Sequence, residues 1–114
     1  MNDFLLILHD SAIDSPFAKL SPEEMQSVIA RYGQWAGQMA SQGKLKGGHK
    51  LEDGTARHMN GTTVTDGPFP ETKEVVGGYF VISAADYDEA VTLASTCPHI
   101  DFGRIEVRRI ELMS

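Results

Sequence analysis

The chain has 114 residues, which by the usual relation between length and domain number corresponds to one domain. Sixteen acidic residues against ten Lys and Arg give a formal charge of −6, and no basic run is present, so direct binding to nucleic acid is not expected. Cys97 is the single cysteine, which excludes an intrachain disulfide and a cysteine-rich metal site. The apolar run at residues 4–8 is too short for a signal core or a membrane span, which predicts a soluble cytoplasmic protein without a membrane partner.

The first half of the chain predicts a buried strand followed by an amphipathic helix. Residues 4–8 are continuously apolar, as in a strand buried on both faces. Ser21 is suited to an N-cap, with Pro22 at the first helical position and Glu24 completing a capping box, and Gly43 predicts the C-terminal stop. The apolar residues of this helix recur at three- and four-residue steps and are Met25, Val28, Ile29, Tyr32, Trp35, Ala36 and Met39.

The middle of the chain predicts a small meander followed by a second central strand. Two turn signals, Asp53-Gly54 and Asn60-Gly61, separate short runs. Residues 75–84 are rich in Val, Ile, Tyr and Phe, which favours a central strand. The three short runs are residues 45–51, 55–59 and 62–65.

The last part of the chain predicts a second helix and a final strand. Asp86 and Glu89 form an Asp-x-x-Glu cap, Pro98 ends the helix, and residues 105–112 are the last strand. The order strand, helix, strands, strand, helix, strand indicates two βαβ halves. The predicted fold is therefore α+β, a ferredoxin-like βαββαβ sandwich with an extra hairpin, in a single domain over residues 1–114.

The predicted sheet also favours a homodimer. Two helices can cover only one face of the sheet, whereas both central strands are apolar at successive positions. A second copy packed sheet against sheet would cover the other face. Leu6 and Ile82 are the residues that we expect in this interface.

A proline-stiffened corner at residues 65–74 is the most distinctive motif of the chain. Pro68 has a fixed φ and disfavours the helical conformation at Gly67, so the chain must turn there. Asp66 stands where the preceding strand ends. Its carboxylate is interpreted either as a general base or electrostatic anchor beside a cleft, or as the acceptor of a structural Asx turn.

The residues Asp66, Gly67, Pro68 and Phe69 resemble the signature of the DGPF subgroup of YCII-related proteins. The resemblance covers nearly the whole chain and implies a fold of the dimeric α+β barrel type, with pockets between helix and sheet. It implies no particular reaction. In the wider YCII group a first-helix histidine is suspected of pairing with an aspartate, but residues 21–42 contain no histidine, so that dyad cannot be transferred to this chain. The other segments that carry the resemblance are residues 3–8, 21–25, 43–51, 73–82 and 103–108.

The catalytic candidates are Asp66, His9 and Tyr32. His9 and the adjacent Asp10 end the first strand, where they would lie either near a cleft between sheet and helix or at an exposed strand terminus. Tyr32 could supply a phenolic hydrogen bond, although aromatic residues at helical spacing usually belong to the core. The ligand-binding candidates are Trp35, Phe69 and Tyr79.

Two further histidines raise the question of a metal site. If Asp53-Gly54 is a two-residue hairpin loop, His49 and His58 face each other across the strands. Such a pair would need a carboxylate and water to hold a divalent metal, and the alternative is a solvated pair on the polar face of the hairpin. Two ligands do not make a site, so no metal is predicted.

His99 and two glycine pairs complete the candidates. His99, just after Pro98, is interpreted as a loop residue, with the lining of a pocket as the alternative. Gly47-Gly48 and Gly77-Gly78 lack the spacing and the following helix of a nucleotide loop, so no phosphate cradle and no cofactor are predicted.

Two functional hypotheses follow. The first is a dimeric small-molecule-binding protein or cofactor-independent enzyme with an acid–base site near Asp66. The alternative is a noncatalytic dimerisation or regulatory module, because DGPF-type proteins are often linked in gene context or fusion to extracytoplasmic-function sigma factors. The chain has no basic patch or helix-turn-helix pattern, so a role in transcription would be indirect.

Overall fold

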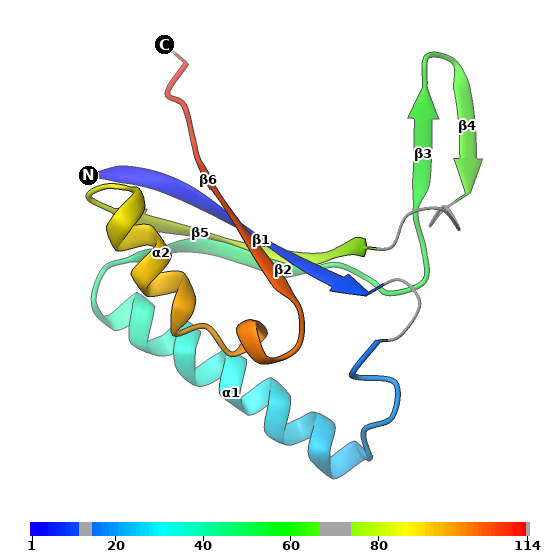
Figure 1. Cartoon of the computed structure of the whole chain (residues 1–114), viewed down its shortest axis with the longest axis horizontal. Helices are drawn as coiled ribbons and strands as arrows, with labels where there is room; N and C mark the ends of the chain where they lie inside the picture. The colour runs from blue at the N-terminus through cyan, green and yellow to red at the C-terminus, as the bar shows by residue number, and fades with distance from the viewer. Residues whose placement is uncertain (12–14, 67–73, 114) are drawn as a thin grey trace.

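The main body of the protein is a four-stranded antiparallel sheet covered on one face by two helices (Figure 1). The computed structural model describes residues 1–11, 15–66 and 74–113. The strand order is β2-β5-β1-β6, and β3 and β4 form a separate two-stranded sheet. The elements are β1 (Asn2–Ser11), α1 (Pro22–Ser41), β2 (Leu45–Lys50), β3 (Arg57–Asn60), β4 (Thr63–Asp66), β5 (Glu74–Ala84), α2 (Tyr87–Ser95), the 3₁₀-helix η1 (Pro98–Asp101) and β6 (Arg104–Arg109).

The element order confirms the predicted α+β class. The long strands β1 and β5 occupy the two central positions of the sheet, as the apolar runs in the sequence indicate. An antiparallel sheet with two helices on one face is compatible with a ferredoxin-like fold. None of the described helices is long and apolar enough to cross a membrane.

Local capping chemistry forms both helices where the sequence predicts them. The Ser21 hydroxyl accepts a hydrogen bond from the Glu24 amide at 3.1 Å, and the Ser21 amide donates to the Glu24 carboxylate at 3.0 Å. Gly43 follows the C-cap of α1 with a φ of 71°, a conformation that glycine adopts without steric cost. The Asp86 carboxylate caps α2 by accepting from the Glu89 amide at 2.9 Å.

The pleat of β1 divides its apolar residues between the two faces of the sheet. Phe4 and Leu6 are fully buried beneath the helices, whereas Leu5 and Ile7 are only partly buried on the opposite side, which we call the open face. Ile82 on β5 lies opposite Phe4 and is also fully buried in the helix-side core. The placement of Leu6 and Ile82 in a sheet-to-sheet interface is therefore wrong, because each central strand turns only every second residue toward the open face.

The meander in the middle of the chain differs from the prediction at Asp53-Gly54. β2 pairs with β5, so that His49 lies opposite Tyr79, and β3 pairs with β4 through the turn after Asn60. The Asn60-Gly61 turn is confirmed, while Asp53-Gly54 belongs to a longer connection between two sheets. His49 and His58 consequently lie in different sheets and do not face each other. The prediction failed because β5 provides a long central strand for β2 to pair with.

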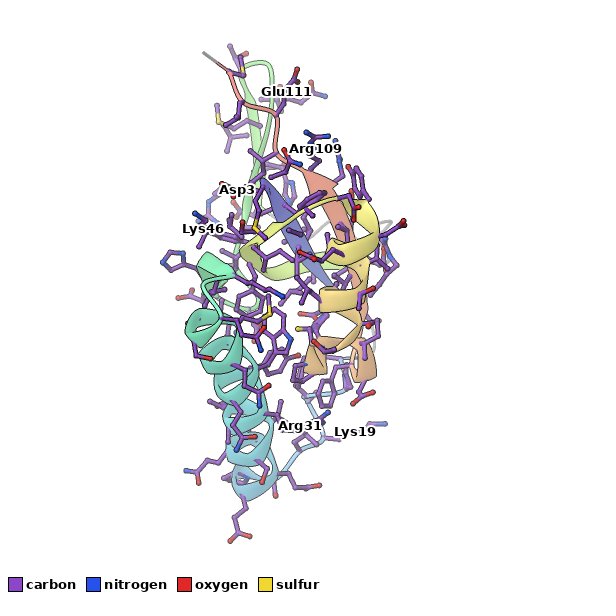
Figure 2. All side chains as sticks on the ribbon, turned by 90° about the vertical axis from the view of Figure 1, so that its left-hand side faces the viewer. Asp3, Lys19, Arg31, Lys46, Arg109 and Glu111 are labelled. Atoms are coloured by element: carbon purple, nitrogen blue, oxygen red, sulfur yellow. The ribbon has the colours of Figure 1, made fainter. Side chains whose placement is uncertain are left out.

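The side view in Figure 2 shows the same layers. Arg31 on α1 lies in the helical half of the molecule, whereas Asp3 and Arg109, on strands of the main sheet, lie in the other half. Glu111, in the segment after β6, lies beyond them. In Figure 1 this C-terminal segment and the β3–β4 hairpin both extend to the side of the sheet that the helices leave open.

Candidate functional site

A cavity of about 320 Å³ lies between α1 and the sheet. The polar residues of its lining include Asp10 of β1, Tyr32 of α1 and His99 of η1, which come from three different elements. An apolar wall with a few convergent polar groups is typical of a small-molecule site. The apolar side chains that line the cavity are Leu8, Phe17, Met25, Val28, Ile29 and Phe80.

Hydrogen bonds at the two ring nitrogens of His99 define the tautomer of its neutral ring. The Tyr32 hydroxyl lies 2.8 Å from Nδ1, and the backbone carbonyl oxygen of His9 lies 3.0 Å from Nε2. A carbonyl oxygen can only accept, so Nε2 carries a proton. In the neutral ring Nδ1 is therefore the acceptor, and the Tyr32 hydroxyl donates to it.

Asp10 lies beside the protonated nitrogen of this ring. Its Oδ1 atom is 3.2 Å from His99 Nε2, and the two side chains are 14% and 4% exposed, respectively. This oxygen is buried and accepts no hydrogen bond within the part of the chain that the structure describes. The carboxylate therefore stabilises positive charge on the ring by proximity, while the His9 carbonyl fixes the orientation of the ring.

Burial shifts the acid–base properties of two of these groups. Desolvation raises the pKa of the Asp10 carboxyl above its ordinary value, although His99 nearby acts in the opposite direction. Desolvation also raises the pKa of the Tyr32 phenol far above its ordinary value. Tyr32 thus remains protonated at any physiological pH, so it can donate one proton and accept another in the same step.

Two glycines make room for the Asp10–His99 pair. The register of β1 and β5 shifts between Leu8 and His9, which leaves Gly77 as the extra residue of a bulge. A Cβ atom on Gly77 would overlap the Asp10 carboxylate, and one on Gly103 would overlap the His9 carbonyl and lie 2.7 Å from His99 Nε2. The absence of these two side chains is therefore required for the observed geometry.

A second ion pair contributes to the same cavity. Lys50 and Asp53 both line it, and the Lys50 ammonium lies 3.2 Å from the Asp53 carboxylate. Both side chains are largely exposed, so the pair belongs to the solvent-facing part of the cavity. The two charges compensate each other, and this part of the lining offers no net positive charge to an anionic ligand.

A shallower groove of about 420 Å³ lies between the two helices and η1 and is more open to solvent. Arg31 and Asp101 form an ion pair of 2.7 Å there, with both side chains about half exposed. The groove lacks a buried titratable pair of the kind that Asp10 and His99 form, so it is the weaker candidate despite its larger volume. Its other lining residues include Gln34, Trp35, Gln38 and Thr96.

Asp66 lies outside both of these depressions. It ends β4, its side chain is 81% exposed, and its carboxylate lies 3.1 Å from Arg57 Nε within the hairpin. It is not among the residues that line the cavity or the groove. A catalytic role for Asp66 stays a prediction, and the arrangement of the described residues does not support it.

The other two catalytic candidates are separated by the sheet. Tyr32 lines the cavity, whereas the His9 ring projects to the open face and bonds with the Glu106 carboxylate at 2.9 Å. His9 approaches the site only through its backbone carbonyl. Of the predicted pair His9-Asp10, it is the side chain of Asp10 that enters the cavity.

The predicted ligand-binding residues Trp35, Tyr79 and Phe69 do not form a common site among the described residues. The buried Trp35 indole donates to the Thr96 hydroxyl at 2.8 Å and packs edge-on against Phe80, as a core residue would. Tyr79 is part of the cavity lining, but its hydroxyl bonds with His49 Nδ1 at 2.8 Å. Because Phe80 faces the helices, the pleat directs the Tyr79 side chain to the open face. Phe69 lies outside the described residues.

The sequence predicts His99 as a loop residue, whereas the structure places it in the lining of the cavity. The available signal was its position directly after Pro98. The fixed φ of Pro98 suits the first position of the short helix η1, and both Pro98 and His99 are buried there. Nothing in the local pattern predicts that the ring reaches Asp10, since the two residues are distant in the chain. Among the described residues, no group of three or more His, Cys, Asp or Glu side chains is arranged to hold a metal ion.

Comparisons with known proteins show the family of the chain. The YCII-related domain family model matches residues 5–114, so the chain belongs to this family. The uncharacterized protein R00369 of Rhizobium meliloti (strain 1021) is 32% identical over 114 residues, covering 95% of this chain and 90% of that protein. A solved structure of 5-chloro-2-hydroxyhydroquinone dehydrochlorinase (TftG) from Burkholderia phenoliruptrix AC1100, in complex with 2,5-dihydroxybenzoquinone, is similar with a TM-score of 0.47 and 18% identity. That match covers 96% of this chain and 93% of the other.

Proposed function

We propose that this YCII-related protein binds a small organic molecule in the cavity between α1 and the sheet and catalyses a proton transfer there without a cofactor. The observation that supports this most directly is the continuous contact from Asp10 through His99 to Tyr32 beside an apolar cavity. A carboxylate, an imidazole and a hydroxyl in this order form a relay in which the carboxylate stabilises the charged ring.

The relay works through the atoms described above. A ligand proton moves to the Tyr32 oxygen as the original Tyr32 proton moves to His99 Nδ1, so the phenol stays neutral and the imidazole becomes positively charged. Asp10 and the His9 carbonyl stabilise that charge at Nε2. Return of the proton to another atom of the ligand would complete an isomerisation, and the relay would be restored to its starting state.

The shape of the cavity limits the ligand. A volume of about 320 Å³ is at the lower end for small-molecule sites. The wall is apolar, and the Lys50–Asp53 pair offers no uncompensated charge. The expected ligand is therefore a small, mostly apolar molecule with one weakly acidic proton.

A binding experiment tests the location of the site. Trp35 is the single tryptophan and packs against Phe80 of the cavity wall, so its fluorescence reports whether the cavity is filled. We expect saturable binding of 4-nitrophenol, weakened about tenfold in Tyr32→Phe and in His99→Gln through the loss of a hydrogen bond. Asp66→Asn is the control and should bind like the wild type. Equal affinity in all four proteins would place the site elsewhere.

A second experiment tests the chemistry. Exchange of solvent deuterium into small cyclic ketones, followed by NMR, detects proton abstraction from carbon. We expect Tyr32→Phe to slow any exchange by about 10² or more, the usual contribution of a positioned acid or base. Binding without exchange would instead favour the noncatalytic alternative, whose indirect link to a sigma factor stays a prediction.

We also propose that the protein acts as a homodimer. Leu5, Ile7, Tyr79 and Val81 lie on the open face, where no described element of the chain covers them. An apolar sheet face of this kind is usually covered by another chain. Light scattering should give about twice the 12.5 kDa mass of the chain, and Ile7→Asp should reduce the mass to that of the monomer.

A further inference from the structure

The β3–β4 hairpin, residues 57–66, stands apart from the main body, and we refer to it as the arm. Its strands pair with each other and not with the main sheet. Figure 1 shows the arm extending beyond the end of the sheet toward the open face, on the side away from both helices. A two-stranded hairpin alone is at best marginally stable in water, so contacts beyond the hairpin itself would stabilise the arm.

One face of the arm carries two exposed apolar side chains. Met59 and Val64 lie directly opposite each other in the strand register and are 73% and 53% exposed. Residues opposite each other in a pair of strands point to the same side, so they form one apolar patch. Arg57 and Asp66, two residues further along each strand, pair on the same side, and their charges cancel.

The size of the exposed surface indicates how large a partner contact would be. The chain exposes 7879 Å², whereas a compact monomer of 12.5 kDa exposes roughly 6,200 Å². Its radius of gyration is 15.5 Å, against roughly 13 Å for a compact domain of this length. The excess of about 1,700 Å² exceeds the roughly 800 Å² that each partner buries in an ordinary stable interface.

We infer that the arm docks on a second copy of the chain that is seated on the open face. This inference rests on the proposed homodimer and adds the contact that the arm makes within it. The open face and the arm lie on the same side of the sheet, so one copy placed against the face is flanked by the arm (Figure 1). Two-fold symmetry then places the arm of each copy on the other. The compensated charges of Arg57 and Asp66 allow this approach despite the net charge of −6 on each chain.

Docking of the arm also bears on the candidate site. The connection from β2 to the arm, residues 51–56, includes Asp53, which lines the cavity and pairs with Lys50. A partner that fixes the position of the arm would also restrain the residue 51–56 connection, and with it the part of the cavity lined by Asp53. The arm thus connects association of two copies with the shape of the ligand site.

Sedimentation equilibrium of matched variants tests the inference. Val64 on the arm and Val91 on α2 are both 53% exposed, so Val64→Lys and Val91→Lys make the same change on two surfaces. We expect Val64→Lys to raise the dimer dissociation constant at least tenfold, Met59→Lys/Val64→Lys to raise it further, and Val91→Lys to leave it unchanged. Each added lysine lowers the net negative charge, so a weaker dimer cannot result from overall charge repulsion.

Hydrogen exchange of the arm provides an independent readout. The amides of residues 57–66 should become more protected as the wild-type concentration rises through the dissociation constant, with no such change in the double variant. A wild-type dimer that Val64→Lys and Val91→Lys weaken to the same extent, or do not weaken, would refute docking of the arm while leaving the homodimer in place. A monomeric wild type at millimolar concentration would refute both.

Discussion

Two of the ion pairs among the described residues, Asp10–His99 and Asp66–Arg57, have nearly the same length but opposite surroundings. Asp10 lies 3.2 Å from His99 and Asp66 lies 3.1 Å from Arg57, but the first pair is almost fully buried, while the side chains of the second are 81% and 66% exposed. Water screens the exposed pair, so its charges matter little to each other or to a ligand. Burial next to a cavity distinguishes the candidate site from the exposed carboxylate at the end of β4.

The largest difference in the free energy of unfolding should appear when the basic residue of each ion pair, His99 or Arg57, is replaced by alanine. His99→Ala leaves the buried Asp10 carboxyl without its partner and opens a hole in the core, which should destabilise the protein by about 3 kcal/mol. Arg57→Ala should change the free energy of unfolding by less than about 0.5 kcal/mol. Urea denaturation measures both changes, and losses of equal size would show that burial does not distinguish the two ion pairs.

A pair of glycine substitutions tests whether the buried pair depends on the bulge. Gly77→Ala places a methyl group against the Asp10 carboxylate and should cost about 2 kcal/mol through overpacking. Gly47→Ala, in the neighbouring part of the same sheet, meets nothing within 4 Å and should be neutral or stabilising by up to about 1 kcal/mol. Thermal unfolding monitored by circular dichroism separates them. A Gly77→Ala protein as stable as Gly47→Ala would show that Asp10 is not confined there.

The pH dependence of stability should reveal the burial of Asp10. Because its pKa is raised in the folded state, the protonated carboxyl favours folding, and this contribution is present below about pH 4 and lost as the pH rises through the folded pKa. The free energy of unfolding of the wild type relative to Asp10→Asn should therefore fall as the pH rises above about 4. Denaturant titrations between pH 3 and 7 give this difference, and parallel curves would contradict the raised pKa.

The smallest effect is expected at the exposed carboxylate. Asp66→Asn should alter the free energy of unfolding by no more than about 0.5 kcal/mol, because a solvent-exposed ion pair contributes little. The measurement is a urea titration at neutral pH beside the wild type. A loss above 1 kcal/mol would mean that Asp66 supports structure beyond its contact with Arg57.

Much of the fold was predictable because its signals are local. The Ser21–Glu24 capping box, the Gly43 stop and the Asp86 cap act within a few residues, and all of them form as predicted. The partner of β2 was predicted incorrectly, because it depends on competition between a nearby hairpin turn and the distant strand β5. The sequence also does not reveal which residues of β1 face the helices and which face the open side, because residues 4–8 are all apolar.

The candidate site was predictable only in part. Tyr32 and Asp10 were recognised as candidates, but the sequence could not indicate that β1, α1 and η1 bring them together at His99. The most distinctive motif of the sequence begins at Asp66, which lies outside the cavity, whereas the cavity is formed by residues with no distinctive motif around them.

Composition, helix caps and apolar runs by themselves determined the class of fold and the order of its elements, because these signals act on neighbouring residues and need no other part of the chain. Which carboxylate is buried beside a histidine depends on the packing of segments that are distant in the chain. That choice depends on the bulge at Gly77, the space left at Gly103 and the approach of three distant segments, which together remove water from Asp10 while Asp66 remains in it.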